Sequence, residues 1–133
     1  MIITIFQNFN AVSAPFHRNI EDIIERIKCG KSKALIEQIN AEKDTTKQKA
    51  LKNSLPAILF SGKFSQRNAA SIIEHSGLIC LDFDNFENET VLNDHREDFI
   101  NDEYTFSVFL SPRKNGLKVL VKIPNEIANH KKY

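Results

Sequence analysis

The chain has 133 residues, which is enough for one domain with a hydrophobic core and too few for two domains of ordinary size. Hydrophobic residues make up 41% of the chain and charged residues 26%, values that are ordinary for a globular protein. No apolar run approaches the roughly 20 residues of a membrane-spanning helix, and residues 1–6 lack the basic start and cleavage site of a signal peptide. We therefore expect a cytoplasmic protein without a membrane partner.

The net charge of +1 conceals a separation of charge along the sequence. Residues 82–103 hold nine acids and one base, whereas residues 113–132 hold six bases and one acid. An acidic segment followed by a basic one suits an anion that is bridged by a metal, such as a nucleotide triphosphate. The alternative is that both segments are solvated surfaces that neutralise each other.

The first 55 residues predict a strand followed by helices. Residues 2–6 alternate weakly, as in a strand, and the isoleucines of residues 20–27 follow the i, i+3, i+4, i+7 spacing of one helix face. Residues 32–53 predict one long helix or two short ones, with Asp44 able to start the second. We interpret residues 1–55 as a helical preface without chemistry, within a single domain 1–133 whose core is residues 56–133.

The remainder predicts a mixed α and β core. A short apolar strand at 57–60, a helix at 66–75 and a strand at 78–84 form a strand–helix–strand unit, which favours parallel pairing of the two strands. Three further elements follow, a helix at 88–100 and strands at 105–110 and 117–123, and Pro112 with Asn115-Gly116 predicts a tight hairpin turn between these strands.

The most informative motif is the apolar strand within residues 76–85, because it ends in Asp82 and Asp84. Residues i and i+2 of a strand point to the same face, so the two carboxylates lie together and repel each other. A divalent cation such as Mg²⁺ or Mn²⁺ relieves this repulsion, since hard cations prefer carboxylate oxygens. An exposed turn that carries two aspartates is the alternative interpretation.

The hairpin turn after residue 110 is the second place that suits chemistry. It offers the Ser111 hydroxyl, the cations Arg113 and Lys114, and Gly116 followed by Lys118. Glycine lets backbone N–H groups approach an anion, and lysine supplies a point charge for phosphate. An ordinary exposed β-hairpin uses the same residue types, so the turn alone does not decide between the two.

Three stretches in this order, residues 55–64, 76–85 and 111–119, resemble the N-terminal domain of virulence-associated protein E-like and mobile-element replication proteins. That domain belongs to the archaeo-eukaryotic primase, or primase–polymerase, superfamily. The resemblance implies an α/β (α+β) fold with a sheet like that of an RNA-recognition motif, preceded by a helical segment. It also implies that the natural protein continues beyond Tyr133, so that this chain is truncated at its C-terminus, with a helicase-type domain to follow.

The resemblance also implies roles for individual residues. Asp82 and Asp84 fall where the superfamily binds its catalytic Mg²⁺ or Mn²⁺ ions, and Ser111, Gly116 and Lys118 fall where it contacts the phosphates of a nucleotide triphosphate. The superfamily's third motif, an acid on a later strand, has no counterpart in this chain.

These observations together predict a primase- or polymerase-like domain for nucleotidyl transfer in the DNA replication of a mobile element or phage. DNA or RNA would be bound through the basic residues Arg113, Lys114 and Lys122. One alternative is a non-catalytic nucleic-acid-binding or adaptor module on the same fold, for which exposed Phe60, Phe106 or Phe109 rings would serve in base stacking. A phosphatase of the haloacid dehalogenase type also places D-x-D after an apolar strand, but it needs a longer downstream sequence.

Overall fold

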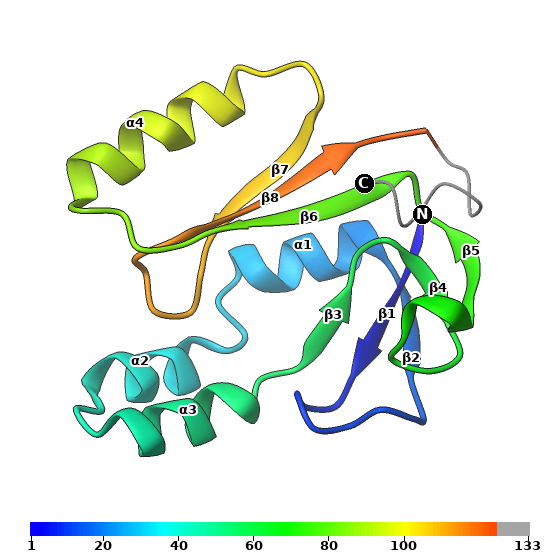
Figure 1. The fold of residues 1–133 in the computed structure, drawn as a ribbon, viewed down its shortest axis with the longest axis horizontal. Helices are drawn as coiled ribbons and strands as arrows, with labels where there is room; N and C mark the ends of the chain where they lie inside the picture. Colours follow the sequence, from blue (N-terminus) through cyan, green and yellow to red (C-terminus); the bar gives the residue numbers. More distant parts are fainter. Residues whose placement is uncertain (125–133) are drawn as a thin grey trace.

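Three antiparallel sheets and four α-helices make up residues 1–124, the part of the chain that the computed structural model describes (Figure 1). This arrangement confirms the predicted mixed α and β class. The helices are α1 (Ile20–Lys28), α2 (Lys33–Ala41), α3 (Thr45–Asn53) and α4 (Glu89–Ile100). The strands are β1 (Ile2–Phe6), β2 (Phe16–Asn19), β3 (Ala57–Leu59), β4 (Gly62–Phe64), β5 (Ile72–His75), β6 (Leu78–Phe83), β7 (Thr105–Leu110) and β8 (Leu117–Lys122).

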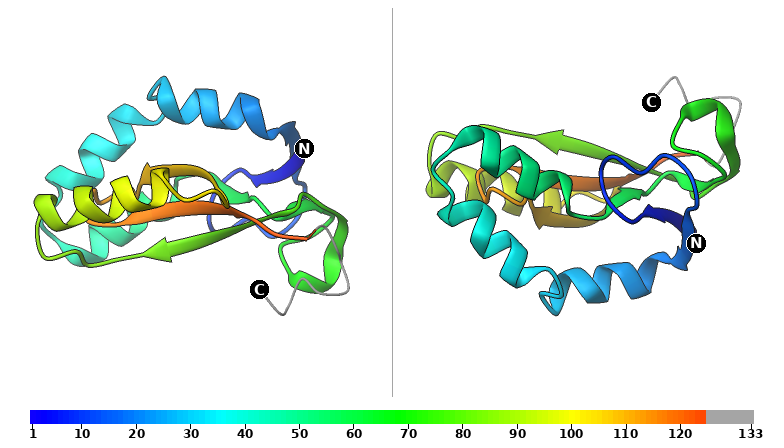
Figure 2. Two further views of the ribbon diagram at one scale, coloured as in Figure 1. Left: turned by 90° about the horizontal axis from the view of Figure 1, so that it is seen from above. Right: turned by 90° about the horizontal axis from the view of Figure 1, so that it is seen from below.

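The first sheet has the order β2-β1-β3 and the third has the order β6-β8-β7. A shared core joins them, because Ile3 of β1 and Leu120 of β8 pack in one cluster with Ile20 and Ile23 of α1. These isoleucines lie on one face of the helix, as their spacing predicts. Helix α1 thus fastens the N-terminal sheet to the sheet that carries Asp82 (Figure 2).

The third sheet is buried on both faces around its central strand β8. Leu120 faces the core with α1, whereas Val119 and Leu117 face a second cluster with Leu92 of α4. Successive residues of a strand point to opposite faces, so an apolar run such as residues 119–121 belongs at the centre of a two-sided sheet. Helix α4 begins at Asn88, whose side chain accepts a hydrogen bond from the backbone N–H of Val91 at 2.9 Å.

The predicted helix at residues 66–75 is wrong. The chain turns back directly after β3, and residues 62–75 form the antiparallel pair β4–β5 around a short 3₁₀ turn at Ala69–Ser71. A Cβ at Gly62 would lie 2.0 Å from the carbonyl oxygen of Glu74, so only glycine allows the two backbones to approach this closely. The apolar residues whose spacing resembled a helix are largely exposed, Ile73 at 55% among them.

The predicted parallel pairing of residues 57–60 with residues 78–84 is also wrong. Strand β3 pairs antiparallel with β1, and β6 pairs antiparallel with β8, so both are end strands of separate sheets. Ser76 joins them at one point, where its backbone N–H donates to the Ser61 carbonyl at 2.8 Å and its hydroxyl donates to the Phe60 carbonyl at 2.6 Å. Beyond this point the strands separate around a cavity of about 400 Å³ with mainly apolar side chains.

None of the helices within residues 1–124 has the length and apolar character needed to cross a membrane.

Candidate functional site

Three neighbouring strands of the third sheet end side by side at Asp84, Gly116 and Ser111. Leu117 of β8 pairs with Phe83 of β6 and with Leu110 of β7. Asp84 and Ser111, which follow these two strands, and Gly116, which precedes β8, therefore form the next row. The backbone N–H of Ser111 donates to the carbonyl of Gly116 at 3.0 Å, which closes the β7–β8 hairpin as predicted. Asp84 and Ser111, which are 27 positions apart in the chain, therefore lie on either side of Gly116.

Gly116 leaves a gap in this row. A Cβ at Gly116 would lie 2.6 Å from the Phe83 carbonyl oxygen, 2.9 Å from Oδ1 of Asp84 and 3.1 Å from Oγ of Ser111. Its backbone φ is not in the left-handed region, so glycine is required here for space and not for conformation. The carboxylate of Asp84 and the hydroxyl of Ser111 consequently border the same small space above the Gly116 backbone.

The Ser111 hydroxyl is buried and has no hydrogen-bond partner within residues 1–124. It shares this state with one other side-chain atom of that part of the chain, Nε of Arg96. A buried polar group without a partner destabilises the folded state by about 1–3 kcal/mol. A water molecule, an ion or a ligand oxygen beside Ser111 would remove that penalty.

Asp82 lies one row further into the sheet and pairs with Lys118 across β6 and β8. The Asp82 carboxylate accepts a hydrogen bond from the Lys118 ammonium at 2.5 Å. Because the side chains are 54% and 31% exposed, this ion pair contributes at most about 1 kcal/mol to stability. Gly116 lies two residues before Lys118 and directly precedes β8, so Asp84 and Asp82 lie over the same face of the sheet.

A pocket of about 180 Å³ opens beside this row. Its lining combines two cations, one acid and three neutral polar residues: Lys52, Arg113, Asp84, Asn85, Ser111 and Asn115. Sequence patterns did not select three of these as site residues, namely Lys52, Asn85 and Asn115. Asn85 has a detectable signal, because its φ of 61° is of the kind that asparagine tolerates at a strand end.

Lys52 carries no signal of its own, since tertiary packing alone brings α3 to the pocket. The Nδ2 group of Asn40 on α2 donates to the Pro112 carbonyl of the β7–β8 turn at 2.9 Å. Gln48 of α3 in turn donates to the Ile39 carbonyl of α2 at 2.8 Å, which holds the two helices together. Lys52 therefore lines the pocket, although the sequence showed no chemistry in residues 32–53.

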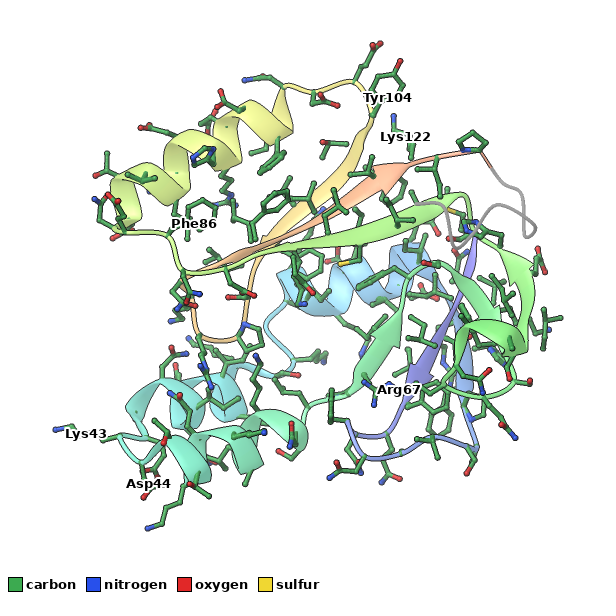
Figure 3. The ribbon with its side chains drawn as sticks, viewed as in Figure 1. Lys43, Asp44, Arg67, Phe86, Tyr104 and Lys122 are labelled. Atoms are coloured by element: carbon green, nitrogen blue, oxygen red, sulfur yellow. The ribbon has the colours of Figure 1, made fainter. Side chains whose placement is uncertain are left out.

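The other basic residues selected from the sequence divide between two ends of the sheet. Arg113 lines the pocket, and Lys114 lies exposed at the tip of the turn with a φ of 62°. Lys122 lies four residues beyond Lys118 on β8, or roughly 13 Å at the rise of a strand. Figure 3 shows it beside Tyr104, whose carbonyl accepts its backbone N–H at 2.8 Å. The structure does not bring Lys122 to Asp84.

Cys80 precedes Asp82 by two residues and is the nearest thiol to the site in sequence. Burial raises the pKa of this thiol to about 11, with Asp82 adding to the rise and Lys118 opposing it. The group is therefore a neutral thiol near pH 7 and packs against the core with α1.

The predicted aromatic surface for base stacking does not form from the three rings selected. Phe60 is buried, and Phe106 and Phe109 are partly buried against the same core. The rings of Phe60 and Phe109 pack on each other with centroids 5.9 Å apart. These rings pack in the core and do not form an exposed aromatic surface.

The oxygen atoms at the site are of the kind that supply part of the coordination of a cation, with a bound ligand and water supplying the rest. Within residues 1–124 no group of three or more His, Cys, Asp or Glu side chains is placed to hold a metal ion. Mg²⁺ usually takes one or two carboxylates together with water and the phosphates of a substrate, not a cage made by protein alone. Asp84, the unpartnered Ser111 hydroxyl and the adjacent Asp82 match that pattern.

Comparison with known proteins corrects the resemblance inferred from the sequence motifs. No curated protein and no solved structure matches the chain significantly. One family does match, over residues 50–133, and it is described as the BT4734-like, N-terminal domain. The match is to neither a virulence-associated protein E-like domain nor a primase–polymerase domain, so that assignment is wrong. Because the match spans more than half of the sequence, the chain belongs to the BT4734-like N-terminal domain family.

Proposed function

We propose that this domain binds a nucleotide triphosphate together with Mg²⁺ or Mn²⁺ at the Asp84–Gly116–Ser111 row, in the service of nucleotidyl transfer. The observation that carries the proposal is the buried Ser111 hydroxyl without a partner, facing the Asp84 carboxylate across the gap at Gly116. A carboxylate and a hydroxyl alone suit many ligands. The adjacent cations Lys52, Arg113 and Lys118 select an anion, and the carboxylates select a metal to bridge to it.

Each side chain has a defined part in this proposal. Asp84 holds the cation, and Ser111 donates its hydroxyl proton to a ligand oxygen above Gly116. Asp82 would serve as a second carboxylate for the cation, and the Lys118 ammonium that pairs with it would then be available to a phosphate oxygen. A bound divalent cation supplies charge neutralisation at the phosphates and polarises them toward attack by a hydroxyl group.

Isothermal titration of residues 1–133 with ATP, in the presence and absence of Mg²⁺, tests the proposal. We expect binding that requires the metal and weakens about tenfold or more in Asp84→Asn, because a charge-assisted contact contributes about 1.5–3 kcal/mol. Asp94→Asn, an exposed carboxylate on α4 away from the pocket, is the matched control and should leave the affinity unchanged. Equal affinities for both variants and the wild type, with and without metal, would overturn the proposal.

A non-catalytic nucleotide- or nucleic-acid-binding module is the second candidate, and one observation favours it. The site draws two carboxylates from residues 1–124, whereas stabilising both ends of a phosphoryl transfer usually takes two metals about 3.5–4 Å apart. Metal-dependent binding without extension of a primer–template would support this candidate, and metal-dependent extension by residues 1–133 would exclude it.

A further inference from the structure

We propose that Lys52 of α3, with Arg113 of the β7–β8 turn, binds the terminal phosphate of the nucleotide. This inference rests on the proposed function, because it assigns an orientation to a ligand at the same site. It adds a residue from the N-terminal half of the chain that neither the motifs nor the row at the sheet edge includes.

The first support is the balance of charge inside the pocket. Lys52 and Arg113 line it together with a single acid, Asp84. Neither cation has an ion-pair partner within residues 1–124, whereas Lys118 is occupied by Asp82. The pocket is therefore positive before a ligand enters, and it becomes more so when a divalent cation joins Asp84. Such a site selects a group with more than one negative charge.

The second support is the size of the pocket. Its volume of about 180 Å³ is smaller than the roughly 300–1,000 Å³ of sites that enclose a whole small molecule. A phosphate group fits in this space, and a nucleoside remains outside it. The terminal phosphate of a triphosphate carries more than one negative charge, whereas a diester phosphate of a nucleic acid carries only one. Lys52 and Arg113 therefore suit the end of a triphosphate better than a nucleic acid backbone.

The third support is that α3 is held at the pocket by specific contacts. Asn40 joins α2 to the turn at Pro112, and Gln48 joins α3 to α2. Asp44 starts α3 by accepting the backbone N–H of Lys47 at 3.0 Å, so the helix is anchored at its beginning and Lys52 lies in its last turn. A lysine in the last turn also interacts favourably with the helix dipole, but this interaction does not require the lysine to line a pocket.

The test compares affinities for ATP, ADP and adenosine with Mg²⁺ present, in the wild type, in Lys52→Gln and in Arg113→Gln. We expect the wild type to bind ATP more tightly than adenosine, and each variant to lose about tenfold for ATP and little for adenosine, which has no phosphate. Lys47→Gln is the matched control, because Lys47 is exposed and lies on a different side of the same helix. Circular dichroism of each variant checks that α3 still forms.

The outcomes separate this inference from the proposed function. If Asp84→Asn weakens ATP binding while Lys52→Gln and Arg113→Gln do not, the nucleotide site stands and the assignment of its terminal phosphate fails. If Lys52→Gln weakens binding of a single-stranded oligonucleotide and not of ATP, the pocket holds a nucleic acid phosphate, and the inference is again wrong. If no variant alters any affinity, both proposals fail.

Discussion

The Ser111 hydroxyl has opposite effects on the stability of the free protein and on the proposed binding of a ligand. Its hydroxyl is buried beside Asp84 without a partner, so the free protein carries a polar group that water would otherwise solvate. Such groups persist in folded proteins mainly where a ligand or ordered water completes them. Replacing Ser111 should therefore change two measurable quantities, the free energy of unfolding and the affinity for the ligand.

We expect Ser111→Ala to leave the free energy of unfolding unchanged or to raise it by up to about 1–3 kcal/mol, because it removes an unsatisfied buried group. The same substitution should weaken binding of ATP with Mg²⁺. Urea denaturation and calorimetric titration measure the two effects separately. A clear loss of stability would show that the hydroxyl already has a partner in the free protein, and binding of ATP equal to that of the wild type would exclude it from the site.

At the scale of the elements, one threonine of β1 forms side-chain hydrogen bonds to the two-stranded sheet β4–β5. The Thr4 hydroxyl donates to the Gly62 carbonyl at 3.0 Å and accepts the backbone N–H of Phe64 at 2.9 Å. Because its single proton is used, Nδ1 of His17 on β2, at 3.1 Å, must carry a proton and donate to it. His17 thus completes a junction between the three strands β1, β2 and β4.

This junction predicts a pH dependence of stability. Burial lowers the pKa of His17 below its ordinary value of 6.5, and Lys63 and Arg18 add to the effect. Since the unfolded chain then binds the proton more readily, the contribution of His17 is complete above pH 6.5 and is lost as the pH falls through its folded-state pKa. We expect the melting temperature to fall more between pH 7.5 and pH 5 in the wild type than in His17→Asn.

His17→Asn keeps an N–H donor for Thr4 and removes the titration. All other histidines are present in both proteins, so the difference between the two melting curves isolates His17. Parallel losses of melting temperature would contradict the assignment.

At the element scale, the sequence predicted those parts whose patterns are local. The isoleucine spacing of residues 20–27, the cap at Asp44 and the alternation of residues 105–110 each gave the element that forms. The segment around Ile72 was predicted wrongly, because its alanines and isoleucines are spaced as on a helix, yet most of them are exposed on a short hairpin. What decided its structure was the close approach of Gly62 to Glu74, which no local pattern reports.

At the scale of the whole molecule, the family boundary differs from the folding unit. The match begins at residue 50, yet β1 is the central strand of the first sheet and Ile3, Ile20 and Ile23 lie in the shared core. Full burial of each isoleucine contributes about 1.5–3 kcal/mol, and an ordinary domain has about 5–15 kcal/mol in total. Residues 1–49 are therefore part of the domain that the matched residues complete.

We expect a protein of residues 50–133 to be unfolded at 25 °C, whereas residues 1–133 should unfold cooperatively. Circular dichroism and the dispersion of amide proton resonances measure this difference. A cooperative thermal transition in the shorter protein would show that β3, β6 and β8 form a core without β1 and α1.

The candidate site shows why position in the fold was harder to predict than residue type. The two aspartates on one strand and the Ser111 turn stood out in the sequence, because their spacing has a direct meaning on a strand and in a hairpin. Lys52 did not, since a lysine in a helix rich in lysine and glutamine has no distinguishing pattern. Its place beside Arg113 follows from packing between segments that lie far apart in the chain.

The hydrogen bond from Asn40 to Pro112 has a consequence for the order of folding. It spans 72 residues, and closing so long a loop is entropically unfavourable until the strands between its ends have paired. Contacts of this range form late and slow the overall rate. Helices α2 and α3 can form early from local contacts, but Asn40 of α2 meets the turn only after β7 and β8 have joined. During synthesis on the ribosome, the pocket is therefore among the last features of the domain to appear.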